Sequence, residues 1–194
     1  MHLLLVRRRF LQGFQLLLVL ACLWAGAARG QGVELAALQV RREDGALTLD
    51  FAARVTLPPA VEDALQRGVP IYFAAEARLL RSRWYWRDER VARVSRSWRV
   101  AYQPLTNTWR VGLGGLHQTF DTLNEALGAA SRSAGWKLAE LASLDPDSRY
   151  TVEFSYRLDT SQLPGPMQFG LGALGSQGEW AVGVARVLQV EPGP

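Results

Sequence analysis

The sequence predicts a mainly β fold: an antiparallel, β-sandwich-like domain of about eight strands with two or three short helices. Short runs in which apolar and polar residues alternate indicate strands, and residues 46–56 and 150–158 alternate most cleanly. Clusters of Gly, Pro, Asp and Asn separate these runs, as expected for turns. No repeat, coiled coil or low-complexity linker divides the chain, so either a sandwich or a strongly bent sheet covered by helices is expected.

The first 30 residues have the three parts of a signal peptide. Arginines at positions 7–9 precede an apolar run at 16–28, and the small residues that follow suit cleavage before Gln31 or before Ala28. The apolar run has about 13 residues, fewer than the roughly 20 that span a bilayer. We therefore expect residues 1–30 to be a cleaved signal peptide. Residues 31–194 are then a single exported, periplasmic, β-rich domain without a membrane span.

Alternatives for the N-terminal segment stay open. The apolar run could be retained as a membrane anchor, or Cys22 could be acylated as in a lipoprotein. The arginines fit both the general secretory route and the twin-arginine route, although nothing downstream indicates a cofactor that would require export in the folded state.

Charge and cysteine content narrow the function classes. Four of the 22 lysines and arginines lie in the first 30 residues, so residues 31–194 carry 18 basic and 18 acidic residues. The formal charge of +4 belongs to the predicted signal and gives no reason to expect nucleic-acid binding. The single cysteine, Cys22, also lies there, which excludes disulfides and thiol chemistry from residues 31–194.

At the start of the domain, a hairpin is predicted between strands at residues 33–40 and 46–56, around a turn at 43–45. Two prolines end the second strand because proline cannot donate to a strand ladder. A short helix at 59–67 follows, with its apolar residues on one face and a glycine at its end.

The later elements follow from the same signals. They are strands at residues 108–113, 150–158, 167–174 and 179–190, a helix at 120–130, a strand or second short helix at 136–144, and turns at 104–107 and 145–147. Asp121 is the predicted N-cap of the helix because its side chain can accept from a free N–H of the first turn. Gly112, Gly114 and Gly115 predict a flexible strand end rather than a phosphate loop, because the lysine and Ser/Thr of that motif are missing.

The most unusual segment is a long hairpin with strands predicted at residues 71–86 and 90–102 and a two-residue turn at Asp88-Glu89. Eight arginines lie between positions 78 and 99, against only these two acids. This register places Arg78 opposite Arg99 and makes one face of the hairpin apolar and the other polar. The apolar face is the predicted core face and carries Ile71, Phe73, Ala75, Ala77, Leu79, Trp98, Val100 and Tyr102.

The polar face of this hairpin is the candidate surface for a ligand or partner. Guanidinium groups suit phosphate or carboxylate, and indole rings suit sugars or stacked guanidinium groups. An alternative without any ligand is that the arginines cover the indoles or pair with acids elsewhere in the domain. The candidate binding residues are Arg78, Trp84, Trp86, Arg93 and Arg99 on the hairpin, with Trp109 and Arg110 on the next strand.

Part of the sequence resembles a known family. The stretch RSRWYWRDERVARVSRSWRVAYQPLTNTWRVGLG at residues 81–114 and the segment LDTSQLP at 158–164 are similar to exported proteobacterial proteins of the uncharacterised domain-of-unknown-function family 4390. The resemblance covers most of residues 31–194 and implies export and the extent of the domain, but no activity. Its members often look to be encoded beside a membrane sensor kinase of the nitrogen-regulation type. The resemblance therefore implies a periplasmic accessory to signalling.

Few residues offer catalytic or metal-binding chemistry. His117 is the only histidine after position 30 and is expected to be an exposed loop residue. A histidine-rich metal site and a Ser-His-Asp triad are therefore disfavoured, and no cofactor or metal is expected. The acidic residues Asp50, Glu76, Glu153 and Asp159 are scattered, and no spacing selects a catalytic pair among them.

The sequence therefore predicts a non-enzymatic, periplasmic interaction domain. Its expected partner is an envelope protein, such as the extracytoplasmic part of a sensor kinase, or an anionic envelope component. The alternative is a carboxylate-dependent envelope hydrolase acting on a glycan, which a cleft with two close carboxylates and one raised pKa would favour. The oligomeric state stays open.

Overall fold

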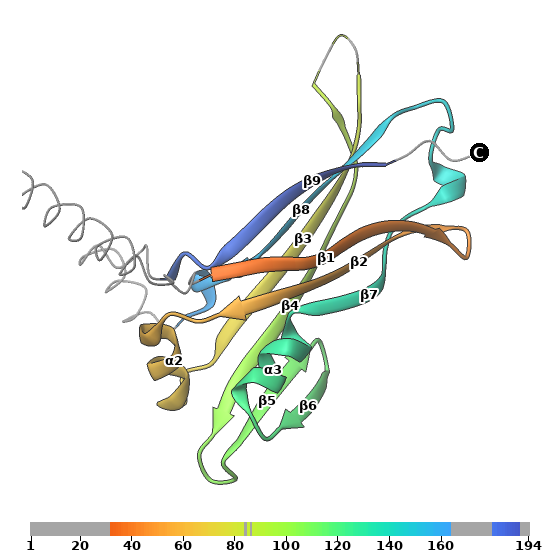
Figure 1. Ribbon diagram of the computed structural model, residues 1–194. Helices are drawn as coiled ribbons and strands as arrows, with labels where there is room; N and C mark the ends of the chain where they lie inside the picture. Colours follow the sequence, from red (N-terminus) through yellow and green to blue (C-terminus); the bar gives the residue numbers. More distant parts are fainter. Residues whose placement is uncertain (1–31, 84, 86, 164–179, 191–194) are drawn as a thin grey trace, which may run out of the picture. The chain divides into compact units, whose positions relative to one another are not determined.

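Nine strands and two α-helices are found in residues 32–83, 85, 87–163 and 180–190, the part of the chain that this computed structural model describes (Figure 1). The strands are β1 (Gly32–Glu43), β2 (Ala46–Thr56), β3 (Ile71–Arg81), β4 (Glu89–Gln103), β5 (Thr108–Leu113), β6 (Leu116–Phe120), β7 (Arg132–Glu140), β8 (Tyr150–Leu158) and β9 (Gly183–Val190). The helices are α2 (Pro59–Gln66) and α3 (Leu123–Ala130), with short 3-10 helices η1 (Leu141–Ser143) and η2 (Thr160–Gln162). The predicted signal at 1–30 and the predicted strand at 167–174 lie outside the described residues.

The strands form two antiparallel sheets. One has three strands in the order β1-β2-β7, and the other has six strands in the order β6-β5-β4-β3-β8-β9. In Figure 1, β1 and β2 cross the strands of the six-stranded sheet, and side chains from both sheets meet in one core. The predicted mainly β, sandwich-like fold is therefore confirmed. Within the described ranges, no helix combines the length and the apolar character needed to cross a bilayer.

An aromatic cluster joins the two sheets. Phe51, on β2 of the three-stranded sheet, lies with its ring centroid 5.9 Å from that of Trp98, 4.9 Å from Phe154 and 5.5 Å from Tyr156, which all belong to the six-stranded sheet. The Tyr156 hydroxyl donates to the carbonyl oxygen of Ala130, the last residue of α3, at 3.0 Å. Burial raises the pKa of Tyr156 well above its ordinary value. The same cluster therefore anchors both sheets and α3.

One of the two α-helices agrees with its predicted range, and the other begins later than predicted. α2 agrees with the helix predicted at 59–67. α3 begins three residues later than predicted because Phe120 belongs to β6. Its N-cap is Thr122 rather than Asp121: the Thr122 hydroxyl accepts from the Glu125 N–H at 3.3 Å, and the Glu125 carboxylate accepts from the Thr122 N–H at 3.2 Å. This reciprocal capping box fixes the start of the helix.

A second correction concerns the glycines at the end of β5. Gly114 and Gly115 form a two-residue turn, and Gly114 has a φ of 58°, a conformation that glycine adopts without strain. The chain returns as β6, a strand that the sequence analysis did not predict. His117 lies on this strand rather than in a loop. The predicted flexible strand end is therefore a tight hairpin.

A third correction concerns the register of the β3–β4 hairpin. Arg78 lies opposite Arg93 rather than Arg99, and residues 82–88 connect the strands in place of the predicted two-residue turn. The pairing partner of Arg78 is displaced by six positions. Because this displacement is even, the side chains between Ile71 and Leu79 and their partners on β4 keep the face that the alternation predicts. A bulge after the Leu79–Ala92 pair shifts the register by one more residue and brings Arg90 opposite Leu80.

Packing and charge explain the observed register. Phe73 lies opposite Trp98, so two large buried side chains occupy facing positions on the core side of the hairpin. At the other end of the pair of strands, Arg81 lies opposite Glu89 and forms an ion pair with it. In the predicted register Glu89 is a turn residue, so neither the Phe73–Trp98 pairing nor the Arg81–Glu89 ion pair can form. The turn residues alone therefore do not determine where this hairpin pairs.

Candidate functional site

The six-stranded sheet has one face in the core and one face directed away from the three-stranded sheet, which we call the outer face. The alternation along β3 and β4 shows the division, because Phe73 and Trp98 are buried whereas their neighbours Tyr72 and Arg99 are not. All four arginines of the predicted binding surface share the outer face. They divide into two groups with different surroundings.

The first group is an arginine–glutamate ladder formed by Glu76, Arg78, Arg93 and Glu153. The Glu76 carboxylate accepts from Arg78 Nε at 2.5 Å and from Arg93 Nη2 at 2.7 Å. Glu153 Oε2 lies 3.7 Å from Arg78 Nη1. The hydrogen bond from Arg93, followed by that from Arg78, lowers the pKa of Glu76 against the opposing effect of burial. Two arginines and two glutamates therefore neutralise one another on β3, β4 and β8.

Further arginines of the β3–β4 hairpin also contact other residues of the domain. At the loop end of the hairpin, Glu89 pairs with Arg81 and, at 2.6 Å, with Arg83. Hydrogen bonds from Arg81 and Arg83 lower the pKa of Glu89. Arg96, which also lines the hollow described below, directs its guanidinium group to the inner face, where the guanidinium carbon is 5.2 Å from the centroid of the Trp136 ring. Charge density along the sequence therefore overstates the charge that the hairpin presents.

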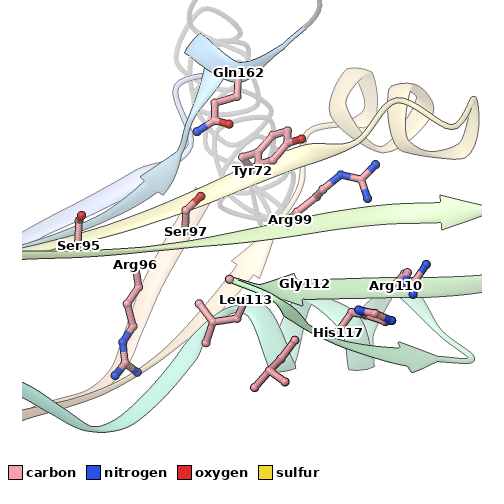
Figure 2. Close-up of a pocket in the computed structure, with 12 residues that line it drawn as sticks. Tyr72, Ser95, Arg96, Ser97, Arg99, Arg110, Gly112, Leu113, His117 and Gln162 are labelled. Carbon is pink, nitrogen blue, oxygen red and sulfur yellow. The ribbon is translucent and has the colours of Figure 1, made fainter.

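The second group lies at an open hollow of about 980 Å³ on the outer face, which we call the basin (Figure 2). Four of its residues form a row opposed in register across four neighbouring strands: Tyr72, Arg99, Gly112 and His117. Arg110 precedes Gly112 by two positions on β5 and so shares its face. The β5–β6 hairpin that the glycine turn creates thus extends the predicted surface by one strand.

The basin is lined by basic and neutral residues. None of the described residues around it is an aspartate or a glutamate. The side chains of Arg99 and Arg110 form no hydrogen bond or ion pair with any residue that the structure describes. Ser97 and Gln162 add hydroxyl and amide groups at the side nearer β3 (Figure 2). The basin is therefore a positively charged hollow without an internal counter-charge among the described residues.

A family model described as "Domain of unknown function (DUF4390)" matches residues 30–186, most of the chain. The chain belongs to this family. The resemblance stated from residues 81–114 is therefore confirmed. No curated protein and no solved structure is significantly similar to the chain. The ladder and the basin both lie within the part of the chain that the DUF4390 model matches.

Of the three tryptophans predicted for the binding surface of this DUF4390 domain, only Trp109 lies among the described residues, and it does not join the four arginines. Trp109 is only 8 % exposed, and its ring centroid lies 4.8 Å from that of Tyr102. It points into the core because it alternates with Arg110 along β5, so its assignment to the binding surface is wrong. Trp84 and Trp86 lie outside the described residues.

Sequence reasoning did not assign Tyr72, Gly112 and His117 to the binding surface. A signal for two of them is present in the sequence. A Gly-Gly pair between two apolar segments is typical of a two-residue hairpin turn. Counting outward from Gly114-Gly115 places Gly112 opposite His117, as observed.

The carboxylates of the DUF4390 domain give no support to the hydrolase alternative, which requires a carboxyl of raised pKa beside a second carboxylate. Glu76 and Glu153 line a hollow of about 530 Å³, but the pKa of Glu76 is lowered. Burial would raise the pKa of Asp159, yet hydrogen bonds from Ser161 and Gln162 outweigh it and leave that pKa lowered. In the described part of the chain, no three His, Cys, Asp or Glu side chains are grouped as metal ligands.

Proposed function

We propose that this protein is an exported, periplasmic binding domain that contacts an anionic partner through the basin on its outer face. The observation that carries the proposal is a difference in pairing. Arg78 and Arg93 have a glutamate between them, whereas Arg99 and Arg110 have no acidic partner among the described residues. Unpaired guanidinium groups at the edge of a hollow are available to phosphate or carboxylate oxygens.

Export is supported by the sequence of residues 1–30, with its arginines, apolar run and small residues before Gln31. The family match begins at residue 30, where the predicted signal ends. Cleavage is the processing we propose, and retention as an anchor or acylation at Cys22 are the alternatives. The N-terminal residue of the protein recovered from the cell envelope distinguishes the three.

Two kinds of partner supply the negative charge that the described lining of the basin lacks. One is an acidic surface of an envelope protein, such as the extracytoplasmic part of a membrane sensor kinase. The other is an anionic component of the envelope itself. In both cases the attraction accelerates encounter and weakens as the salt concentration rises. The domain then acts as an accessory that recognises the partner rather than transforming it.

Site-specific photocrosslinking in cells that produce the full chain tests this proposal. A photoreactive residue replaces Ser97 in the basin or, as a comparison, Thr56, an exposed position on β2. We expect a crosslinked product from position 97 only. We also expect Arg99→Glu with Arg110→Glu to abolish it and Arg54→Glu, at an exposed position on β2, to preserve it.

Three results would contradict the proposal: no product from position 97, equal products from positions 97 and 56, or a product that survives reversal of both basin arginines. Thermal unfolding of each purified variant shows whether a lost product reflects lost folding instead. If the double variant is unfolded, the single variants Arg99→Gln and Arg110→Gln replace it.

A further inference from the structure

We propose that the basin contains a phosphate-binding site above Gly112, formed by Arg99, Arg110 and His117, which binds the phosphate ester of a small hydroxylated molecule. This inference rests on the proposed function, because it names the anionic group that the basin recognises. It is carried by the register of β4, β5 and β6 rather than by charge alone.

Gly112 is a gap in a row of longer side chains. Arg99 lies beside it on β4 and His117 beside it on β6. Neighbouring strands are roughly 4.8 Å apart, so roughly 10 Å separates the backbones of these two residues across the glycine. Arg110 lies on the same face of β5, roughly 7 Å from Gly112 along the strand. The hollow is therefore bounded on three sides by hydrogen-bond donors and is open down to the backbone.

This arrangement suits a tetrahedral anion better than a planar one. The phosphate of an ester carries three terminal oxygens that can accept from donors in different directions. A carboxylate has two oxygens in one plane, and a single guanidinium fork satisfies both. Here two guanidinium groups and an imidazole surround one hollow, and no described residue that lines it carries a carboxylate.

The remainder of the basin indicates the kind of molecule to which the phosphate is esterified. At about 980 Å³ the basin is much larger than a phosphate group, and it extends to the polar side chains of Tyr72, Ser97 and Gln162 (Figure 2). Hydroxyl and amide groups of this kind pair with the hydroxyls of glycerol or a sugar. A phospholipid headgroup and a soluble phosphate ester share this chemistry, and the experiment below separates them.

Gly112→Val is the most direct variant for testing the site. The φ of Gly112 is outside the left-handed region, and an added Cβ would meet only Leu116 O at 3.7 Å and Arg99 Cβ at 4.0 Å, which are ordinary contacts. Valine also favours a strand. The variant is therefore expected to fold with its hollow filled. Gln118→Val is the matched control, because it places the same side chain on β6 but on the face opposite to His117, outside the residues that line the basin.

The experiment is calorimetric titration of the exported protein, purified from producing cells, with glycerol 3-phosphate, inorganic phosphate and acetate. We expect saturable binding of both phosphate compounds and binding of acetate that is at least about tenfold weaker. Gly112→Val and the double variant Arg99→Gln/Arg110→Gln should each lower the affinity for glycerol 3-phosphate about tenfold or more. Gln118→Val and Arg54→Gln should leave it within about twofold.

Unchanged affinity in Gly112→Val, no saturable binding of either phosphate compound, or acetate binding as strong as phosphate binding would overturn the inference. Thermal unfolding confirms that each variant is folded, and the arginine variant decides the question if Gly112→Val is not. Crosslinking from Ser97 without phosphate binding would remove this inference and leave the proposed function in place. Absence of both would remove both.

Vesicles separate the two sources of the phosphate. We compare binding to vesicles of phosphatidylcholine alone with binding to vesicles that also contain phosphatidylglycerol. Binding that requires phosphatidylglycerol and is lost in Gly112→Val supports the site with a lipid headgroup as its ligand. Binding of glycerol 3-phosphate without vesicle binding supports the site with a soluble ester as its ligand.

Discussion

The ladder and the basin occupy the same face of the same sheet, yet their arginines are in opposite situations. In the ladder, Glu76 lies between Arg78 and Arg93 and its side chain is only 15 % exposed. In the basin, Arg99 and Arg110 border a hollow whose described lining contains no acid. Both regions contain arginines, and they differ in whether an acidic residue lies beside those arginines.

This difference shows that a run of arginines is not in itself a binding site. Guanidinium groups that a neighbouring carboxylate already satisfies offer little to a ligand, because binding must first break existing hydrogen bonds. Arginines without such a neighbour keep their donors for a partner. The predictions below therefore change the acidic neighbours and compare the response of the two regions.

The largest expected effect on stability comes from removing the acid at the centre of the ladder. Glu76→Gln leaves Arg78 and Arg93 facing each other across β3 and β4 with only the more distant Glu153 as a counter-charge, and like charges in that position repel. We expect the free energy of unfolding to fall by about 1 kcal/mol, measured by urea denaturation. Arg99→Gln, which breaks no ion pair with a described residue, should change it by less than about 0.5 kcal/mol. Equal losses would erase the distinction between the regions.

The stability that the ladder provides should depend on pH in a defined direction. The pKa of Glu76 lies below its usual value of 4.5, mainly because Arg93 and Arg78 donate to the carboxylate. A carboxyl of lowered folded-state pKa stabilises the fold above its unfolded pKa, and this contribution disappears as the pH falls through the folded pKa. The difference between the unmodified protein and Glu76→Gln should therefore be complete at pH 7 and shrink below about pH 4.5. A difference that is constant from pH 7 to pH 3 would contradict this account.

The sequence predicted which face of the sheet carries the arginines of the ladder and the basin, but it did not predict which residues lie opposite them. Alternation along a strand assigns Arg78, Arg93 and Arg99 to one face in any register that is displaced by an even number of residues. Which residues are opposite one another depends on long-range contacts, such as Phe73 with Trp98. Local turn signals cannot supply these contacts, so the predicted pairing of Arg78 with Arg99 is wrong.

The basin was incompletely predicted for a local reason as well. The prediction of a flexible end at the glycines after β5 places His117 in a loop and leaves Gly112 without a neighbour on its far side. The prediction places Trp109 on the same surface as Arg110, although adjacent residues of a strand point to opposite faces and Trp109 is buried. A strict application of the two-residue period would have corrected Trp109, and the Gly-Gly turn signal would have revealed β6.

The smallest expected change in stability comes from giving the basin an acid of its own. In the ladder, Glu76 and Arg78 are two positions apart on one strand and hydrogen-bonded, and Ser97→Glu reproduces that spacing with Arg99. We expect the free energy of unfolding to rise by at most about 0.5 kcal/mol, because the new pair is exposed. The affinity for glycerol 3-phosphate should nevertheless fall several-fold, while Ser97→Gln, of similar size but neutral, should bind more tightly than Ser97→Glu. If both variants bind equally well, the missing acid is not what distinguishes the basin from the ladder, and the shape of the hollow above Gly112 must account for the difference alone.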